Sequence, residues 1–398
     1  MMKILVVSQY FWPEEFRIND ICEGLIEQGH EVEVLTGIPN YPHGNFFEGH
    51  SIFKPGVKEY KGAKIRRVPL VPRGKDNFIK LGLNYISYTI TASIASLGLL
   101  FNKYDRVFVF QLSPITLAIP GIIVSKIKKI PSIIYVQDLW PESLFSIKEV
   151  NNTKVRGILD KICSSIYKSF DKLLITSKSF EEELVNKGVS REKIDYFPQW
   201  AEDFYSLNES SKKNNKEEFV ITFAGNIGKA QSVDTIIKAA KLAKKNKNIK
   251  WQILGDGSEF KYIKSLVNEF KLNETVSLLG RKPASDMPKY FSESDALIVT
   301  LKDDKVWRAT LPAKVQSYMA SGKPILAAIS GEGNSVIKQS KCGLVGEAED
   351  HIKLYENVIE LYNMSEEERE ILGNNGKKYF EDNFTRKILL NKLEQVMN

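Results

Sequence analysis

The sequence predicts an α/β protein made of two doubly wound parallel-sheet domains. Short apolar runs of strand length alternate with amphipathic segments of helix length. This alternation begins twice, near residues 4 and 219, and a length of 398 residues suits two domains of ordinary size. We therefore expect two Rossmann-like domains facing an interdomain cleft, a place where ligands commonly bind.

The first half opens with a strand–helix–strand unit. Ile4–Val7 is an apolar run typical of a buried parallel strand. Apolar residues at helical spacing follow it, Gly29 ends that helix, and Glu31–Thr36 forms the next strand. Four more strands are expected, at residues 106–110, 132–137, 172–176 and 194–197.

The second half repeats the pattern after a polar linker at Asn208–Glu218. Phe219–Ala224 is a strand and Ser232–Lys245 is an amphipathic helix. Further strands are expected at 251–254, 276–279, 296–300 and 324–329, and a helix at Arg386–Met397. The predicted domains are residues 1–200 and 201–384, with a C-terminal helix at 385–398 that crosses back to the first domain.

Composition narrows the class of partner. The net charge of +7 suits an anionic substrate or membrane surface, and no basic stripe interleaved with aromatics indicates nucleic-acid binding. The three cysteines lie far apart, which favours a reducing, cytoplasmic location. The four histidines show no ligand spacing, so we expect no required metal and no cofactor.

The apolar stretch Phe78–Phe101 is interrupted by polar residues. A membrane span needs about 20 mostly apolar residues, so a core helix or a helix lying on a membrane surface fits this stretch better. The N-terminal apolar run is too short for a secretory signal peptide.

Two second-half segments are candidates for binding a diphosphate. The first follows a strand, where glycines let the backbone approach a phosphate and a lysine adds charge; it comprises Gly225, Asn226, Gly228 and Lys229. The second is a predicted helix start near Pro312 that carries Arg308, Thr310, Leu311 and Lys314. An ordinary strand–helix turn and solvated cations are the alternatives.

Two first-half segments are candidates for binding an acceptor. Asp138 follows a predicted strand and suits an acceptor hydroxyl or its proton, while Trp140 suits a sugar ring. The loop after the first strand is unusually aromatic and offers Tyr10, Trp12, Arg17 and Asn19. A helix-capping aspartate and aromatic core packing remain open alternatives.

At these motifs the chain resembles the retaining glycosyltransferases of family 4, which have the two-domain GT-B fold. The motifs are the strand Lys3–Ser8, the loop Gly225–Gln231 and the run 320–324. Within the family it is most similar to the N-acetyl-L-fucosaminyl transferases (WbuB-like) of O-antigen and capsule synthesis. That closer similarity rests on residues 9–14, 37–42, 137–141 and 311–314.

The resemblance implies a UDP-sugar donor on the second domain, with the uracil near Gly280, Arg281 and Lys282. Its usual pair of glutamates is replaced here by Ala309 and Ser317, so Ser317 is a weaker candidate for the nucleoside. Lys229, Arg308 and Lys314 would stabilise the leaving diphosphate without a metal, and Asp138 would serve the acceptor.

The resemblance also implies a polyprenyl-diphosphate-linked sugar as acceptor and peripheral contact with the inner membrane face. Two alternatives remain open at this point. One is a UDP-sugar 2-epimerase of the same fold, and the other is a non-enzymatic sugar-binding protein with two lobes.

Overall fold

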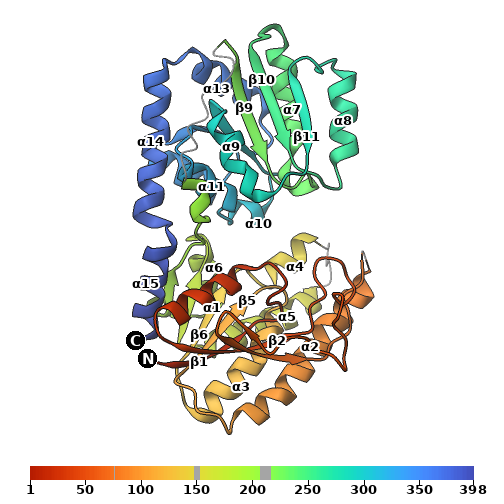
Figure 1. Ribbon diagram of the computed structural model, residues 1–398, viewed down its shortest axis with the longest axis vertical. Helices are drawn as coiled ribbons and strands as arrows, with labels where there is room; N and C mark the ends of the chain where they lie inside the picture. The colour runs from red at the N-terminus through yellow and green to blue at the C-terminus, as the bar shows by residue number, and fades with distance from the viewer. Residues whose placement is uncertain (76, 148–152, 207–216) are drawn as a thin grey trace. The chain divides into compact units, whose positions relative to one another are not determined.

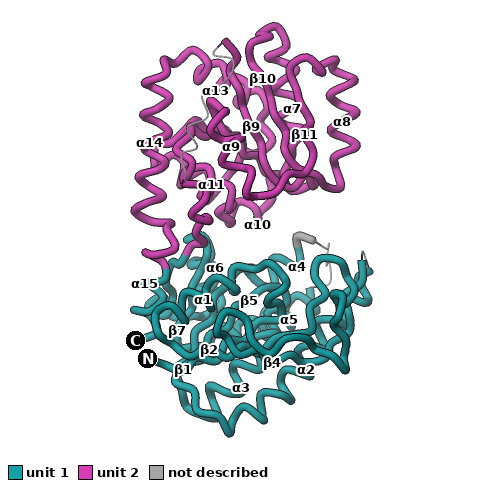
Figure 2. The backbone as a smooth tube through the Cα atoms, viewed as in Figure 1, with its two compact units in different colours: residues 1–197, 390–398 teal, residues 198–389 magenta. Residues whose placement is uncertain are grey.

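The computed structural model describes residues 1–75, 77–147, 153–206 and 217–398. They form two compact units: unit 1 is residues 1–197 with 390–398, and unit 2 is residues 198–389 (Figures 1 and 2). The predicted boundaries, 200/201 and 384/385, lie within a few residues of these. Most of the expected linker Asn208–Glu218 lies outside the described residues.

Unit 1 contains an eight-stranded sheet, sheet A, with the order β3-β4-β2-β1-β5-β6-β7-β8 among the described residues. Only the pair β3–β4 is antiparallel. The strands are β1 (Lys3–Val7), β2 (Glu31–Gly37), β3 (Glu59–Tyr60), β4 (Ala63–Val68), β5 (Arg106–Gln111), β6 (Ser132–Val136), β7 (Lys172–Ile175) and β8 (Ile194–Tyr196).

Helices cover both faces of sheet A (Figure 1). They are α1 (Arg17–Glu27), α2 (Phe78–Leu99), α3 (Ile119–Lys128), α4 (Glu142–Ile147), α5 (Thr153–Lys168), α6 (Phe180–Asn186) and the end of α15 (Arg386–Met397).

Unit 2 contains a six-stranded parallel sheet, sheet B, with the order β11-β10-β9-β12-β13-β14 among the described residues. Its strands are β9 (Phe219–Ala224), β10 (Ile249–Leu254), β11 (Val276–Gly280), β12 (Ala296–Thr300), β13 (Ile325–Ala328) and β14 (Gly343–Gly346). Its helices are α7 (Val233–Leu242), α8 (Phe260–Glu269), α9 (Met287–Ser292), α10 (Lys305–Arg308), α11 (Ala313–Ala320), α12 (Glu332–Ser340), α13 (His351–Asn363) and α14 (Glu366–Asn383).

The prediction of two parallel-sheet α/β domains is confirmed, and every strand expected from an apolar run is present. The strands β3, β4 and β14 were not predicted. Strand β4 alternates buried residues with exposed Lys64 and half-buried Arg67, and β14 begins and ends with glycine, so neither has the continuous apolar run that marked the others.

Both sheets reverse their strand order at one point, between β1 and β5 in sheet A and between β9 and β12 in sheet B. In open α/β sheets, ligands bind beyond the carboxyl ends of the strands at this switch point. The loops that follow β1, β5, β9 and β12 are therefore the positions where site residues are expected.

The C-terminal helix α15 completes unit 1. Leu390, Leu393 and Met397 are buried, and a Cβ built on Gly24 of α1 would lie 2.4 Å from Leu390 Cδ1. The Arg106 guanidinium donates to the Met397 carbonyl at 2.6 Å. Because α15 packs closely on α1, its apolar face belongs to the core of unit 1.

We predict that Leu393→Ala destabilises unit 1 by about 2–5 kcal/mol, because it removes a fully buried side chain and leaves a cavity. Hydrogen exchange of the β1 and α1 amides reports on the opening of this unit. Leu97→Ala is the control, since Leu97 is 50% exposed and its loss should change protection by less than about 0.5 kcal/mol. Equal effects of the two changes would contradict the packing described for α15.

Candidate functional site

The predicted diphosphate-binding segments meet at the carboxyl edge of sheet B. Since the sheet is parallel, the loops after β9, β11, β12 and β13 all lie at this edge. The loops after β9 and β12 are joined directly, because Lys302 N donates to Ala230 O at 2.9 Å and Thr300 Oγ1 donates to Gln231 O at 2.6 Å. The candidate site is therefore centred on the switch point of sheet B.

The loop after β9 is held by its own hydrogen bonds. Gly225 N donates to Leu254 O at 2.9 Å, and Gly228 N donates to the Gln231 side chain at 3.2 Å. These two N–H groups are already used within the protein, so they are not the donors that would face a phosphate. Lys229 and Asn226 are exposed, and a short 3-10 turn, Lys229–Gln231, precedes α7 where a single helix start was expected.

Lys314, at the start of α11, reaches back to this loop. Its Nζ lies 4.1 Å from the centroid of the Phe223 ring, and a Cβ built on Gly225 would lie 2.3 Å from Lys314 Cε. Burial lowers the pKa of Lys314 to about 7. The structure thus joins the two predicted segments through an amine whose pKa a nearby anion would raise.

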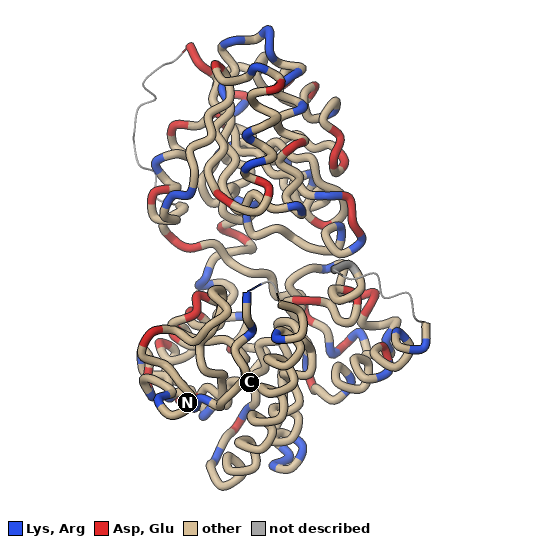
Figure 3. The backbone as a smooth tube through the Cα atoms, turned by 90° about the vertical axis from the view of Figure 1, so that its right-hand side faces the viewer, with Lys and Arg blue, Asp and Glu red and all other residues tan. Residues whose placement is uncertain are grey.

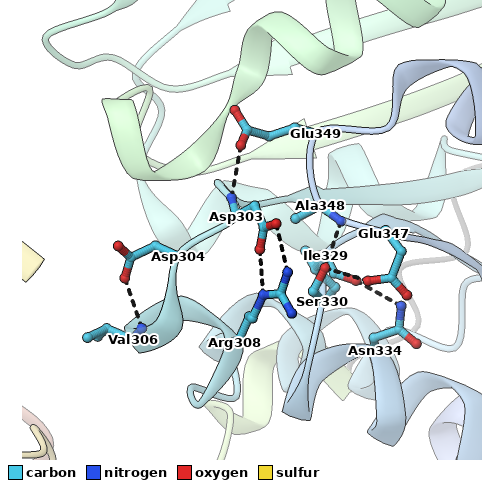
Figure 4. Close-up of polar contacts among 10 residues, drawn as sticks. All are labelled: Asp303, Asp304, Val306, Arg308, Ile329, Ser330, Asn334, Glu347, Ala348 and Glu349. Carbon is cyan, nitrogen blue, oxygen red and sulfur yellow. Dashed lines mark hydrogen bonds and ion pairs between the residues drawn. The ribbon is translucent and has the colours of Figure 1, made fainter. Parts of the chain in front are cut away.

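Arg308 is not a free cation. Its guanidinium forms a fork with the Asp303 carboxylate, at 2.5 Å from Nε and 2.7 Å from Nη2 (Figure 4). Both side chains are exposed, and the pair holds the pKa of Asp303 below its usual range. Lys314 is therefore the better-placed cation of the two for a diphosphate.

The loops after β13 and β14 support this region (Figure 4). Ser330 Oγ donates to Glu347 Oε2 at 2.6 Å, and Asn334 Nδ2 donates to Ile329 O at 2.8 Å. Gly331 has a φ of +77°, and a Cβ there would lie 2.0 Å from Arg308 O. Only glycine fits this contact.

The remaining donor-site predictions lie around the same edge. Gly280 O accepts from Gly255 N at 2.9 Å, and exposed Arg281 and Lys282 follow it.

The other predicted residues lie before and within α11. Thr310 Oγ1 donates to Val306 O at 2.8 Å, Leu311 is buried, and Ser317 Oγ donates to Ala313 O at 3.3 Å. Among the carboxylates here, sequence reasoning missed Glu332, which is only 8% exposed at the start of α12.

In unit 1, Asp138 belongs to a small polar cluster beyond β5 and β6. Ser113 Oγ donates to Asp138 Oδ2 at 2.8 Å, and Trp140 Nε1 donates to Ser113 Oγ at 2.9 Å. Burial raises the pKa of Asp138, which suits a group that exchanges a proton. Trp140 is 9% exposed, so it serves packing more than it offers a platform for a sugar.

The aromatic loop after β1 packs largely on itself. The Tyr10 ring stacks on Phe16 at 5.1 Å, and the Trp12 ring stacks on Tyr60 at 4.8 Å. Asn19 accepts from Trp12 N at 3.0 Å and donates to Glu14 O at 2.8 Å. Arg17 pairs with Asp20. Of the four predicted acceptor residues here, Asn19 has a clear role in holding the loop.

Sequence reasoning missed the residue that organises these loops. Glu14 is 1% exposed, and its carboxylate accepts from the backbone N–H groups of Asn40 and Tyr41 at 2.8 Å and of Phe11 at 3.2 Å. Desolvation raises the pKa of Glu14 to about 7 although these donors oppose the shift. A charged residue inside an aromatic run was the only signal in the sequence.

No group of three or more His, Cys, Asp or Glu side chains is placed to hold a metal ion in residues 1–75, 77–147, 153–206 and 217–398. The absence of a metal requirement stays a prediction.

Comparison with known proteins gives two family matches. Residues 15–200 match the glycosyl transferase 4-like domain, and residues 206–379 match glycosyl transferases group 1. A curated relative, the putative colanic acid biosynthesis glycosyl transferase WcaI of Escherichia coli K12, is 24% identical over 341 residues, covering 81% of this chain and 82% of WcaI.

Two solved structures share the GT-B fold. Anabaena Alr3699/HepE, solved in complex with UDP and glucose, matches with a TM-score of 0.66 at 15% sequence identity. The match covers 100% of this chain and 99% of the Alr3699/HepE chain. Sucrose-phosphate synthase of Thermosynechococcus elongatus has a TM-score of 0.73 at 14% identity, with 100% and 98% covered. These neighbours confirm the predicted GT-B architecture.

We predict that affinity for a UDP-sugar falls as the pH rises above 7, by up to about tenfold per unit. The pKa of Lys314 is about 7 in the free protein and rises when a diphosphate binds, so above pH 7 binding requires proton uptake. Titration calorimetry between pH 6.5 and 9 measures the dependence. Lys314→Met should bind more weakly and without this slope; a slope that persists in the variant would remove Lys314 from the site.

Proposed function

We propose that this chain, a glycosyltransferase with a 4-like domain followed by a group 1 domain, moves a sugar from a UDP-sugar to a lipid-linked saccharide. The observation that carries the proposal is the contact between Lys314 and Gly225 at the switch point of sheet B. It brings a buried amine to a glycine loop at the edge where open α/β sheets bind ligands.

The chemistry of the leaving group supports this assignment. Breaking the bond between sugar and phosphate leaves negative charge on the diphosphate, which a preorganised cation stabilises. Lys314 would supply that charge. Lys229, an exposed residue of the loop after β9, is a second cation of the same region. We propose that no metal is needed. The presence of UDP in the Alr3699/HepE structure supports a UDP-linked donor.

N-acetyl-L-fucosamine is the sugar we propose, in the synthesis of a bacterial capsule or O-antigen. Its support is the similarity of residues 9–14, 37–42, 137–141 and 311–314 to transferases of that sugar. The relationship to WcaI supports a role in surface polysaccharide synthesis. The family matches favour transfer over the 2-epimerase and the sugar-binding protein.

We predict that UDP and UDP-N-acetyl-L-fucosamine raise the melting temperature, and that UDP is released slowly from that sugar nucleotide. A ligand at 100 times its Kd adds about 2.7 kcal/mol of stability. UDP-GlcNAc and NAD are the comparison ligands in a thermal-shift and hydrolysis screen.

Lys314→Ala should lose about 10²–10³-fold in turnover. No response to any UDP compound would overturn the donor site.

Contact with the cytoplasmic membrane face is also part of the proposal, because a lipid-linked acceptor resides there. Its support is an apolar stripe on α2, exposed at intervals of four and three residues: Ile79, Leu83, Ile86, Ile90, Ile94 and Leu97. Exposed Phe101 follows just after the helix ends. Within the described part of the chain, no helix has the length and apolarity to cross a bilayer.

The charge around the stripe suits an anionic surface. Lys80 is the one charged residue of α2, so most of the helix has the colour of uncharged residues in Figure 3. Lys126, Lys128 and Lys129 end the neighbouring helix α3, and Lys128 Nζ donates to Leu100 O at 3.0 Å. A helix that is apolar on one face and flanked by lysines is typical of one that lies in the membrane interface.

We predict that the double variant Ile86→Glu and Ile90→Glu loses most binding to vesicles of phosphatidylglycerol and phosphatidylethanolamine. These side chains are more than half exposed, so the fold should tolerate the change. Ile352→Glu and Ile371→Glu in unit 2 are controls of matched exposure and should bind as the wild type does. Vesicle flotation measures binding. Retained binding by the α2 variant would contradict this role.

A further inference from the structure

An arginine in the loop that joins β4 to α2 has no part in the site described so far. Arg73 follows β4, which runs parallel to β2, so this loop lies at the carboxyl edge of sheet A with the loops after β1 and β2. Its guanidinium lies 3.4 Å from the Tyr10 hydroxyl and 4.9 Å from the centroid of the Tyr41 ring. The arginine therefore spans three loops of the edge.

The ion pairs among the described residues do not include Arg73. Aromatic rings hold the guanidinium in place, and this cation–π contact leaves its N–H groups able to bind an anion. Arg308, by contrast, is neutralised by the carboxylate of Asp303. Arg73 is thus a positioned charge whose counterion is not a carboxylate of the described chain.

Buried amides fix the loop that carries this arginine. Arg73 N donates to Asn40 Oδ1 at 3.1 Å, and the Asn84 amide on α2 donates to Val71 O at 2.7 Å and to Asn40 at 3.3 Å. Asn40 and Asn84 are fully buried. Because Asn40 N also donates to Glu14, the backbone of Arg73 is tied to a buried hydrogen-bond network.

Tyrosine hydroxyls belong to the electrostatic surroundings of Arg73. The half-buried Tyr85 of α2 has a raised pKa because of burial, and the charges of Arg73 and Asp138 act on that pKa in opposite directions. A guanidinium beside tyrosine hydroxyls is suited to the oxygens of a phosphate.

Apolar side chains flank the same loop. Val71 is 38% exposed, and Phe78 and Ile79, in the first turn of α2, are 60% and 77% exposed. A phosphate ligand that also carries a hydrocarbon chain would find both kinds of surface within a few residues. A free phosphate would use only the arginine and the hydroxyls.

We infer that Arg73, held in place by Tyr10 and Tyr41, binds the diphosphate of a prenyl-diphosphate-linked acceptor, while Val71, Phe78 and Ile79 contact its first isoprene units. The inference rests on the proposed function for the identity of the acceptor. Arg73 is then a residue that selects the acceptor and has no role in donor binding.

The test measures binding of farnesyl diphosphate, inorganic pyrophosphate and farnesol to the full chain by titration calorimetry. Arg73→Gln should weaken farnesyl diphosphate binding by about 10- to 100-fold, the effect of losing a charged hydrogen-bonding group. Arg73→Lys should recover part of the affinity by keeping the charge. Arg191→Gln is the control, because Arg191 is an exposed arginine of the same unit, paired with Glu181. Melting temperatures check that all variants are folded.

The expected result is loss of farnesyl diphosphate binding in Arg73→Gln with UDP affinity unchanged. Farnesyl diphosphate binding equal to that of the wild type would overturn the assignment, as would an equal loss of UDP binding. Pyrophosphate that binds as tightly as farnesyl diphosphate would overturn the apolar part. If the wild type does not bind UDP but Arg73 still controls farnesyl diphosphate binding, the proposed function fails and this site stands.

Discussion

The arrangement of the candidate donor site depends on the close approach of two backbone segments beyond β9 and β10. A Cβ on Gly255 would lie 1.8 Å from Gly225 O, and one on Gly257 would lie 2.4 Å from Ile227 O. Glycines at these positions let the loops join through the bonds from Gly225 N to Leu254 O and from Ile227 N to Asp256 O. The space above Gly225 is then filled by Lys314, so the position of the amine follows from the missing side chains.

The acceptor edge is built by a different principle. A buried carboxylate, Glu14, collects three backbone N–H groups from two loops, and burial without such partners would be costly. The buried amides of Asn40 and Asn84 extend this network to the loop of Arg73. In unit 2, glycines allow the loops of the candidate site to approach closely. In unit 1, the loops of the candidate site are held by buried polar groups that hydrogen-bond to one another.

The sequence was sufficient for the fold because the buried strands, such as Phe219–Ala224, are continuous apolar runs whose pattern is local. The Gly225 loop and Lys314 were singled out because each stands in a short motif, and the structure brings them into contact. The sequence could not show the pairing of Arg308 with Asp303, nor the network around Glu14. The hydrogen bond from Gln9 to Asn84, for example, joins residues 75 positions apart, and such contacts exist only once the chain has folded.

The packing of α15 on α1 has a consequence for biosynthesis. Unit 1 is discontinuous: residues 390–398 belong to it, although the ribosome makes them after all of unit 2. Until they emerge, the face of α1 at Gly24 lacks the cover that Leu390 provides. The first unit to be translated is therefore the last to finish folding, and a nascent chain exposes apolar surface at α1 for as long as unit 2 is being made.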